Sequence, residues 1–286
     1  MKSLNQLIIT LMVCLFSIQA WAQSGKLFNT DNQLSSNLAT QVFQDKSGFI
    51  WIATRNGLNT YDGYHITVMK KDMSNFLGLK SNYINSIAQD DKGHILLGTN
   101  NSLLEFTGSE FHKIPMLDSK GEELATYVKQ VYPLKNKDVA VATSGYGIMI
   151  KKKDAQECHA MKGEVEKLKY IHKLLEDKRG RLWIITEDGK LYRKETNGRV
   201  TSHFVGTEGV DAQDIQQDVL GNLYLASKNQ GVHLLRAGSN VFTRISSIGN
   251  LPIENIYISR NNKLYIGCDG LGIYVYDPQT GFLQDN

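Results

Sequence analysis

One pattern occurs six times along this chain, and this repetition limits the possible folds more than any other feature. In each copy an apolar stretch leads to a polar turn, and an alternating segment then ends at an anchor residue. The six apolar stretches begin at Val42, Ile87, Val131, Leu174, Ile215 and Ile256. The anchors are Thr54, Thr99, Thr143, Thr186, Ser227 and Cys268, spaced 45, 44, 43, 41 and 41 residues apart. This period suits four short strands with their turns.

The composition of the regular segments favours strands over a helical repeat. The runs Phe49 to Thr54 and Arg181 to Thr186 are rich in β-branched and aromatic residues, and glycine turns precede them. Units that cannot bury an apolar face alone must stack, so the sequence predicts an all-β fold, a β-propeller of four-stranded blades. The blades are expected near residues 34–72, 79–115, 123–161, 165–205, 209–246 and 249–286.

Within the first unit, four strands are expected. They run from Leu38 to Asp45, Phe49 to Thr54, Leu58 to Tyr61 and Tyr64 to Lys70, with Asn56–Gly57 and Asp62–Gly63 supplying tight turns. One segment stays ambiguous, because the apolar residues between Val165 and Leu175 also fit one face of a helix. We interpret it as the first strand of the fourth unit because its end matches the first unit in register.

The closure of the ring is left open by the sequence. Six repeats are visible, and the last ends at Gly281 to Leu283 with little room for a fourth strand. The segment Lys26 to Thr30 precedes the first unit and could supply the outermost strand of a final blade. That blade would be either the sixth or a seventh.

The first 22 residues have the pattern of an export signal. A short basic start precedes the apolar run Leu7 to Ile18, and Ala20–Trp21–Ala22 is a small-x-small cleavage site. We expect a signal peptide at 1–22, a propeller at 23–286 and a periplasmic location. A noncleaved anchor is the alternative.

Composition excludes several classes of function. The 32 basic and 29 acidic residues leave a net charge of +3, too small to indicate nucleic-acid binding. The histidines show no metal-ligand spacing and no His-Glu-x-x-His motif, so neither a metal site nor a cofactor is expected. Cys158 and Cys268 fall in different units, and we expect both to be unpaired.

A ligand site is expected on one particular face of the propeller. In a four-stranded meander, the loops between the second and third strands share a face with the connections to the next blade, and the turns between the first and second strands lie opposite. The candidate residues on the first face are Arg55, Asn56, Asn100, Tyr146, Glu187, Asp188, Lys228, Asn229 and Asp269. Each of them also fits ordinary turn chemistry on a solvated rim.

Three stretches of the first unit resemble a known repeat. Leu34 to Asn37, Gln44 to Thr54 and Asn56 to Gly63 are similar to the two-component regulator propeller repeat, and the likeness recurs in the second and fourth units. The resemblance implies the amino-terminal periplasmic sensor portion of a hybrid two-component histidine kinase, built from seven-bladed propellers. It further implies oligosaccharide ligands, a possible homodimer, and a kinase downstream in the same polypeptide.

Kinase motifs are missing from this sequence, so we expect the chain itself not to be an enzyme. Two alternatives remain. A free-standing exported propeller could act as a protein-interaction platform, because fold alone does not identify function. A sialidase-like glycoside hydrolase is the other alternative. In that family's motif the Asp lies two residues before the Gly, whereas the repeated Asp here lies three residues before it.

Overall fold

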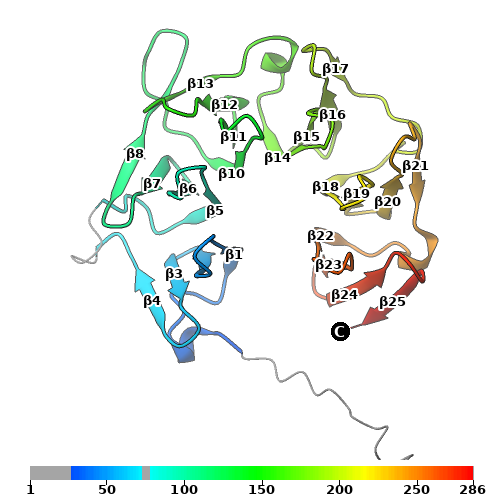
Figure 1. Cartoon of the computed structure of the whole chain (residues 1–286), viewed down its shortest axis with the longest axis horizontal. Coiled ribbons are helices and arrows are strands. Elements are labelled where there is room, and N and C mark those ends of the chain that lie inside the picture. Colours follow the sequence, from blue (N-terminus) through cyan, green and yellow to red (C-terminus); the bar gives the residue numbers. More distant parts are fainter. Residues whose placement is uncertain (1–26, 73–77, 286) are drawn as a thin grey trace, which may run out of the picture.

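Six antiparallel sheets are arranged around a central opening (Figure 1). The structure is a computed structural model that describes residues 27–72 and 78–285, with the side chain of Asn32 left out. The predicted signal peptide, 1–22, lies outside these residues. Within the described ranges, no helix has both the length and the apolar character needed to cross a membrane. The all-β propeller of four-stranded blades is therefore confirmed, with six blades.

Every blade is a meander whose first strand lies nearest the opening (Figure 1). The first three blades consist of β1 (Ala39–Gln44), β2 (Ile50–Thr54), β3 (Gly57–Tyr61), β4 (Ile66–Met69); β5 (Ile84–Gln89), β6 (Ile95–Thr99), β7 (Leu103–Phe106), β8 (Phe111–Ile114); β10 (Val128–Pro133), β11 (Val139–Thr143), β12 (Ile148–Lys151), β13 (Cys158–Ala160). A short strand, β9 (Met116–Leu117), adds to the third sheet by pairing in parallel with β13.

The last three blades follow the same plan. They consist of β14 (Ile171–Glu176), β15 (Leu182–Thr186), β16 (Leu191–Lys194), β17 (Val200–Thr201); β18 (Ala212–Gln217), β19 (Leu223–Ser227), β20 (Gly231–Leu235), β21 (Phe242–Arg244); β22 (Ile253–Ile258), β23 (Leu264–Cys268), β24 (Gly272–Asp277), β25 (Phe282–Asp285). The connections contain three 3-10 turns: η1 (Thr30–Asn32), η2 (Glu164–Lys167) and η3 (Ser246–Ile248).

The structure resolves three details that the sequence left open. The ambiguous segment of the fourth unit is a strand, β14, preceded by the single 3-10 turn η2. The sixth blade has a complete fourth strand, β25, despite its short sequence. No strand lies between residue 27 and Ala39, so the segment ending at Thr30 does not form the outermost strand of a final blade here. Instead, the Phe28 ring packs edge-on against Tyr61, with centroids 5.0 Å apart.

The anchor residues owe their identity to the hairpin that follows them. The hydroxyl of Thr54 donates to the carbonyl of Gly57 at 2.8 Å, and that of Thr143 donates to Gly147 at 2.7 Å. Ser227 makes the equivalent bond to Gly231 at 3.1 Å. A small side chain with a hydroxyl therefore closes the hairpin between the second and third strands in the first five blades, which explains its recurrence there, whereas the sixth blade has Cys268.

The Asp of the turn between the first and second strands locks the opposite end of the blade. One oxygen of Asp45 accepts backbone N–H groups of Ser47 and Phe49, and the other accepts the Trp51 indole at 2.8 Å. Asp177 repeats the arrangement with the indole of Trp183 at 2.9 Å. The expectation that both tryptophans are core residues is confirmed, because Trp51 is 6% exposed and Trp183 is fully buried.

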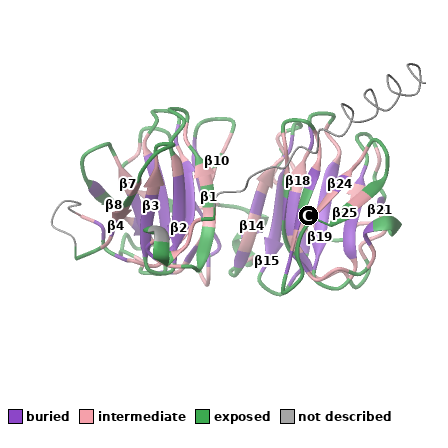
Figure 2. Cartoon of the chain, turned by 90° about the horizontal axis from the view of Figure 1, so that it is seen from below, coloured by how far each residue is buried: buried purple, intermediate pink, exposed green. Residues whose placement is uncertain are grey.

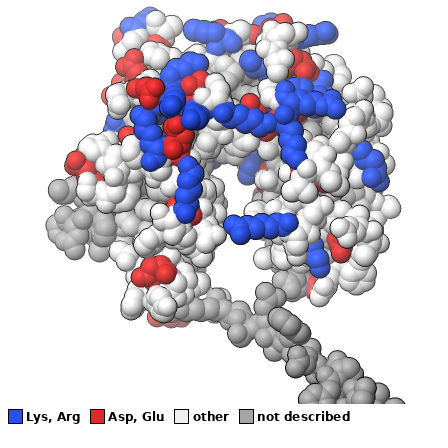
Figure 3. Space-filling model, viewed as in Figure 1, with Lys and Arg blue, Asp and Glu red and all other residues white. Residues whose placement is uncertain are grey.

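Apolar clusters seal the blades to one another at five interfaces. Each cluster joins the second strand of one blade to the first strand of the next, from the first blade to the sixth. Among the described residues no such cluster joins the sixth blade to the first. Figure 3 shows the central opening continuing between these two blades, and Figure 2 looks through that gap to β10 and β14 on the far side. Six blades therefore surround the opening without sealing it.

Candidate functional site at the channel mouth

Two residues from each blade meet at one end of the central channel. In every blade but the second, the residue that follows the second strand donates its N–H to the carbonyl of the residue that precedes the first strand. Such bonds join Arg55 to Leu38 at 3.1 Å, Glu187 to Tyr170 at 3.0 Å and Lys228 to Asp211 at 2.9 Å. The face on which the sequence placed its candidate site is thus assembled as expected, and we call this set the channel mouth: Leu38, Arg55, Tyr83, Asn100, Tyr127, Ser144, Tyr170, Glu187, Asp211, Lys228, Pro252 and Asp269.

Three tyrosines occupy equivalent positions in consecutive blades of the channel mouth. Tyr83, Tyr127 and Tyr170 each stand directly before a first strand, 44 and 43 residues apart. The rings of Tyr83 and Tyr127 pack edge to face at 6.1 Å. Tyr170 is 58% exposed. The sequence analysis missed this series, although its spacing matches the repeat.

Charged groups surround the tyrosines. The Arg55 guanidinium lies over the Tyr83 ring at 5.7 Å, and the Lys129 ammonium lies over Tyr127 at 4.8 Å. Lys129 also pairs with Glu187 at 3.4 Å, which links the third blade to the fourth. Burial raises the pKa of Tyr127 to about 12, so its hydroxyl stays protonated and donates to Asn85 at 2.8 Å.

Two adjoining cavities extend from the channel mouth over the fourth blade. The larger, about 800 Å³, lies between the fourth and fifth blades and is lined by Asp188, Tyr192, His203 and Phe204 among others. The smaller, about 460 Å³, is lined by Tyr170, Glu187 and also by Asp188 and Tyr192. Because they share two lining residues, the cavities form one groove. It offers aromatic faces beside carboxylates and hydroxyls.

The Asp188 carboxylate is held in its ionised form. The Lys190 ammonium lies 2.7 Å from it, and the Thr186 hydroxyl donates to it at 2.6 Å. Both hydrogen bonds lower the pKa of Asp188, the lysine most strongly. A glycosidase general acid needs the opposite shift, so Asp188 is suited to accepting hydrogen bonds from a ligand and not to protonating one.

All nine residues predicted for the site are exposed, but they divide into two groups. Five of them, Arg55, Glu187, Asp188, Lys228 and Asp269, contribute charges to the channel mouth or the groove, and Lys228 lies 3.7 Å from Glu254.

The other four predicted residues take part less directly. Asn229 accepts the Asp211 N–H and donates to the Gly209 carbonyl, so its amide serves a turn. Asn100 accepts the Ser81 hydroxyl at 2.8 Å. Asn56 donates its backbone N–H to Thr54. Tyr146 is 44% exposed, and its side chain makes no hydrogen bond to another described residue.

Basic side chains are distributed unevenly around the ring. Figure 3 shows them beside the central opening and, on the face in view, gathered mainly over the third and fourth blades. On the turn face, opposite the channel mouth, Asp90, His94 and Glu105 form a group of three potential metal ligands, the one such group in the part of the chain that the structure describes. The sequence analysis found no ligand spacing here, because Glu105 lies 11 residues after His94 and meets it only through the pairing of β6 with β7.

Comparison with known proteins agrees with this architecture. The family model described as the two component regulator propeller matches residues 33–56, 78–101 and 167–188. These matches fall in the first, second and fourth units, where the sequence resemblance is most specific. No curated protein matches the sequence.

Several solved structures share the fold. The extracellular domain of a putative hybrid two component system from B. thetaiotaomicron superposes with a TM-score of 0.77 at 24% identity, over 90% of this chain and 36% of that one. The extracellular domain of a putative one component system from the same organism gives 0.76 at 17%, over 92% and 38%. This chain therefore spans little more than a third of those domains.

A streptogramin B lyase also matches, with a TM-score of 0.68 at 12% identity, over 88% of this chain and 83% of the lyase. Propellers of similar shape thus differ in activity, and the fold alone assigns none. The repeat motifs are more specific than the shape of the propeller. The matched stretches include Asp45, Asp90 and Asp177, whose carboxylates accept backbone N–H groups of the turn between the first and second strands. The chain is a six-bladed propeller, and its first, second and fourth units match the two-component regulator propeller repeat.

Proposed function

We propose that this chain is the ligand-sensing propeller of an exported hybrid two-component regulator. In this proposal it lies in the periplasm, binds oligosaccharides and signals to a histidine kinase elsewhere in the same polypeptide, with a homodimer as the signalling form. The matching repeats and the fold shared with extracellular domains of two-component systems support it.

The observation that carries the ligand assignment is the row of three tyrosines at the channel mouth. Aromatic faces pack well against the apolar faces of sugar rings, and neighbouring carboxylates and amides accept hydrogen bonds from sugar hydroxyls. Tyr170 and Tyr192 line the groove together with Glu187 and Asp188. The groove is open, so it suits an extended chain of sugars better than a small enclosed ligand.

Binding experiments with a matched control test this proposal. Calorimetry against oligosaccharides prepared from different polysaccharides should identify at least one ligand. Tyr170→Ala should weaken its binding by about 1 kcal/mol or more, as expected for loss of one aromatic contact. Tyr64→Ala is the control, because Tyr64 is 83% exposed and lies in a turn on the opposite face. Equal loss in both variants, or no binding by any oligosaccharide, would contradict the sugar site and favour an interaction platform.

Catalysis is not part of the proposal. We expect the isolated chain neither to autophosphorylate nor to cleave oligosaccharides, since Asp188 is held ionised and the sequence carries no nucleotide-binding motif. Radiolabelled ATP and an assay for new reducing ends check the two activities. Release of new reducing ends would contradict the sensor proposal and indicate a glycoside hydrolase.

A further inference from the structure

The turn between the first and second strands repeats one hydrogen-bonding scheme in several blades. One oxygen of its Asp accepts two backbone N–H groups, and the other accepts a side-chain donor. That donor is the Trp51 indole for Asp45, the Trp183 indole for Asp177 and the Asn222 amide for Asp218, at 2.8, 2.9 and 2.8 Å. Both oxygens of these aspartates are therefore satisfied.

The second blade breaks this scheme. Oδ1 of Asp90 accepts the N–H groups of Lys92 and His94 at 2.9 and 2.8 Å, as elsewhere. Oδ2 receives no indole or amide hydrogen bond, because Leu96 stands where the first and fourth blades have tryptophan, and its partner is His94 Nδ1 at 3.4 Å. Asp90 is only 5% exposed. A buried carboxylate oxygen with only this one long contact is weakly satisfied, so a bound cation would be a better partner for it.

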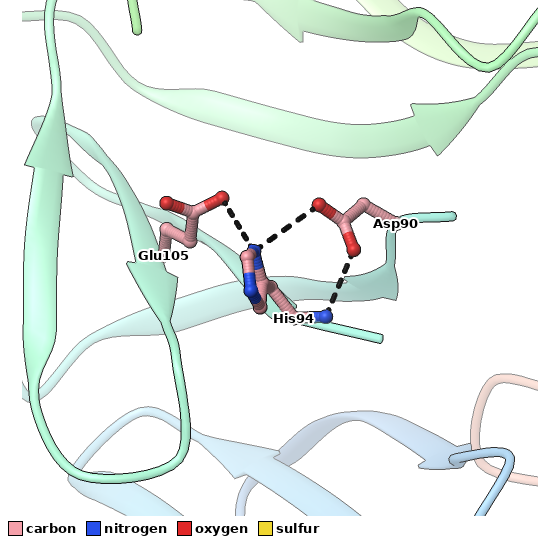
Figure 4. A group of neighbouring side chains, drawn as sticks. All are labelled: Asp90, His94 and Glu105. Atoms are coloured by element: carbon pink, nitrogen blue, oxygen red, sulfur yellow. Dashed lines mark hydrogen bonds and ion pairs between the residues drawn. The ribbon is translucent and has the colours of Figure 1, made fainter. Parts of the chain in front are cut away.

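Two further ligand atoms face this oxygen. His94 Nδ1 lies 3.4 Å from Asp90 Oδ2 and 3.2 Å from Glu105 Oε1. Figure 4 shows the imidazole between the two carboxylates, which point toward it from either side. Glu105 comes from β7, and its side chain is 12% exposed, whereas that of His94 is 32% exposed. The three atoms lie within 4.8 Å of one another.

We infer that Asp90, His94 and Glu105 form a binding site for a divalent transition metal, and that Zn²⁺ is the ion it suits. Zinc bonds to nitrogen and oxygen are about 2.0–2.2 Å long, so tetrahedral ligands lie roughly 3.3–3.6 Å apart. The two separations from His94 Nδ1, 3.2 and 3.4 Å, nearly meet this requirement before any ion binds, and all three atoms lie within 4.8 Å of one another. The partial exposure of His94 leaves room for water as a fourth ligand.

The ligands are held in place by groups of the second blade and by Lys46 of the first blade. The backbone N–H groups that bind Oδ1 fix the Asp90 carboxylate, and the Lys46 ammonium donates to the Asp90 carbonyl at 3.3 Å. An ion at this site would tie the turn to the third strand of the blade, β7. Because it binds the folded state, it would stabilise the second blade.

A zinc titration of the purified chain, prepared without a histidine tag, tests this site. Zn²⁺ alone is the probe, bound metal is counted after dialysis against buffered zinc, and X-ray absorption identifies the ligands. The informative variant is His94→Asn, because Asn222 occupies the equivalent position in the fifth blade and donates to its Asp. It should fold with an unchanged melting temperature in zinc-free buffer. Glu105→Gln is a second variant.

His65→Asn is the matched control, since His65 lies 3.8 Å from Asp62 on the surface with its side chain 85% exposed. We expect one zinc per chain in the wild type and in the control. In His94→Asn and Glu105→Gln the affinity should fall by more than about tenfold, since even outer-shell changes cost about 10–100-fold. The inference is overturned if the wild type binds no zinc, or if His94→Asn binds it as tightly as the wild type.

Discussion

Five interfaces between neighbouring blades are sealed, whereas the flank between the sixth and first blades is open. Side chains at equivalent positions of the repeat are buried at the sealed interfaces and exposed at the open flank. The fourth residue of the first strand faces the preceding blade, and at Ile87, Val131, Leu174, Ile215 and Ile256 it is 1–3% exposed. Val42, its equivalent in the first blade, is 62% exposed. On the other side, Tyr265 of the sixth blade is 36% exposed, while its equivalents Trp51, Leu96, Ala140, Trp183 and Tyr224 are at most 6% exposed.

This difference shows that the repeat fixes the residue type, whereas the neighbouring blade fixes its burial. Val42 and Tyr265 retain the apolar chemistry of positions that pack elsewhere. Exposed neighbours such as Tyr257 and Ile273 enlarge the patch on the sixth blade. Exposed apolar patches of this kind mark surfaces that are covered in the working molecule. We therefore expect a seventh blade between the sixth and the first, as the family resemblance implies.

Replacing the same strand position at a sealed interface and at the open flank should give the largest difference in the free energy of unfolding. Trp183→Ala should reduce the free energy of unfolding by about 3–5 kcal/mol, because it leaves a cavity and removes the donor to Asp177. Tyr265→Ala should cost less than about 1 kcal/mol, as for surface substitutions. Urea unfolding of both variants measures the difference. Similar losses would show that the flank is packed in solution.

Adding one further repeat should remove the difference in burial between the sealed interfaces and the open flank. A chain extended by about 45 residues, one further repeat, would bury Val42 and Tyr265, and burial of one such side chain contributes about 1.5–3 kcal/mol. The extended chain should be monomeric and melt several degrees higher, whereas residues 23–286 alone should tend to aggregate through the exposed edge. Size-exclusion chromatography and thermal scans at equal concentration compare them. If the shorter chain is monomeric and melts as high, six blades suffice.

Acidification should weaken the sealed region through Asp177. Burial acts to raise the pKa of Asp177, but hydrogen bonds from Trp183 and Arg181 outweigh it and hold the pKa below the ordinary 3.8. A depressed carboxyl pKa stabilises the fold above the unfolded-state value and loses this contribution as the pH falls through the folded-state value. Unfolding free energies measured from pH 5 to pH 3 should therefore fall less steeply in Asp177→Asn. Parallel curves would exclude this carboxylate as a source of acid sensitivity.

Cysteine labelling should give the smallest effect. Cys158 and Cys268 are both free and buried, as the sequence predicted. Burial raises the pKa of Cys158 to about 12 and also raises that of Cys268, which lies in the sixth blade at 8% exposure. Alkylation of the unfolded, unreduced chain should add two labels, and in the native chain Cys268 should react first. Faster labelling of Cys158 would indicate that the third blade opens more readily than the sixth.

The sequence by itself determined the blade architecture, because that information is local. The period, the glycine turns and the hydroxyl anchors each act within a few residues, and the first-unit strands fell within about two residues of their predicted ends. The sequence also indicated which face carries the loops of the site, since alternating strand direction dictates it. Five of the nine predicted residues supply charges there.

Only the tertiary structure decided which side chains meet. Tyr83 and Tyr127 touch because consecutive blades converge at the channel, and Glu105 reaches His94 because β7 pairs with β6 in one particular register. Val42 is exposed because the sixth blade, more than 200 residues later in the sequence, does not pack against it. A repeat specifies the blade that it builds, but packing between blades selects the partners. The site and the open flank therefore follow from the arrangement of the blades.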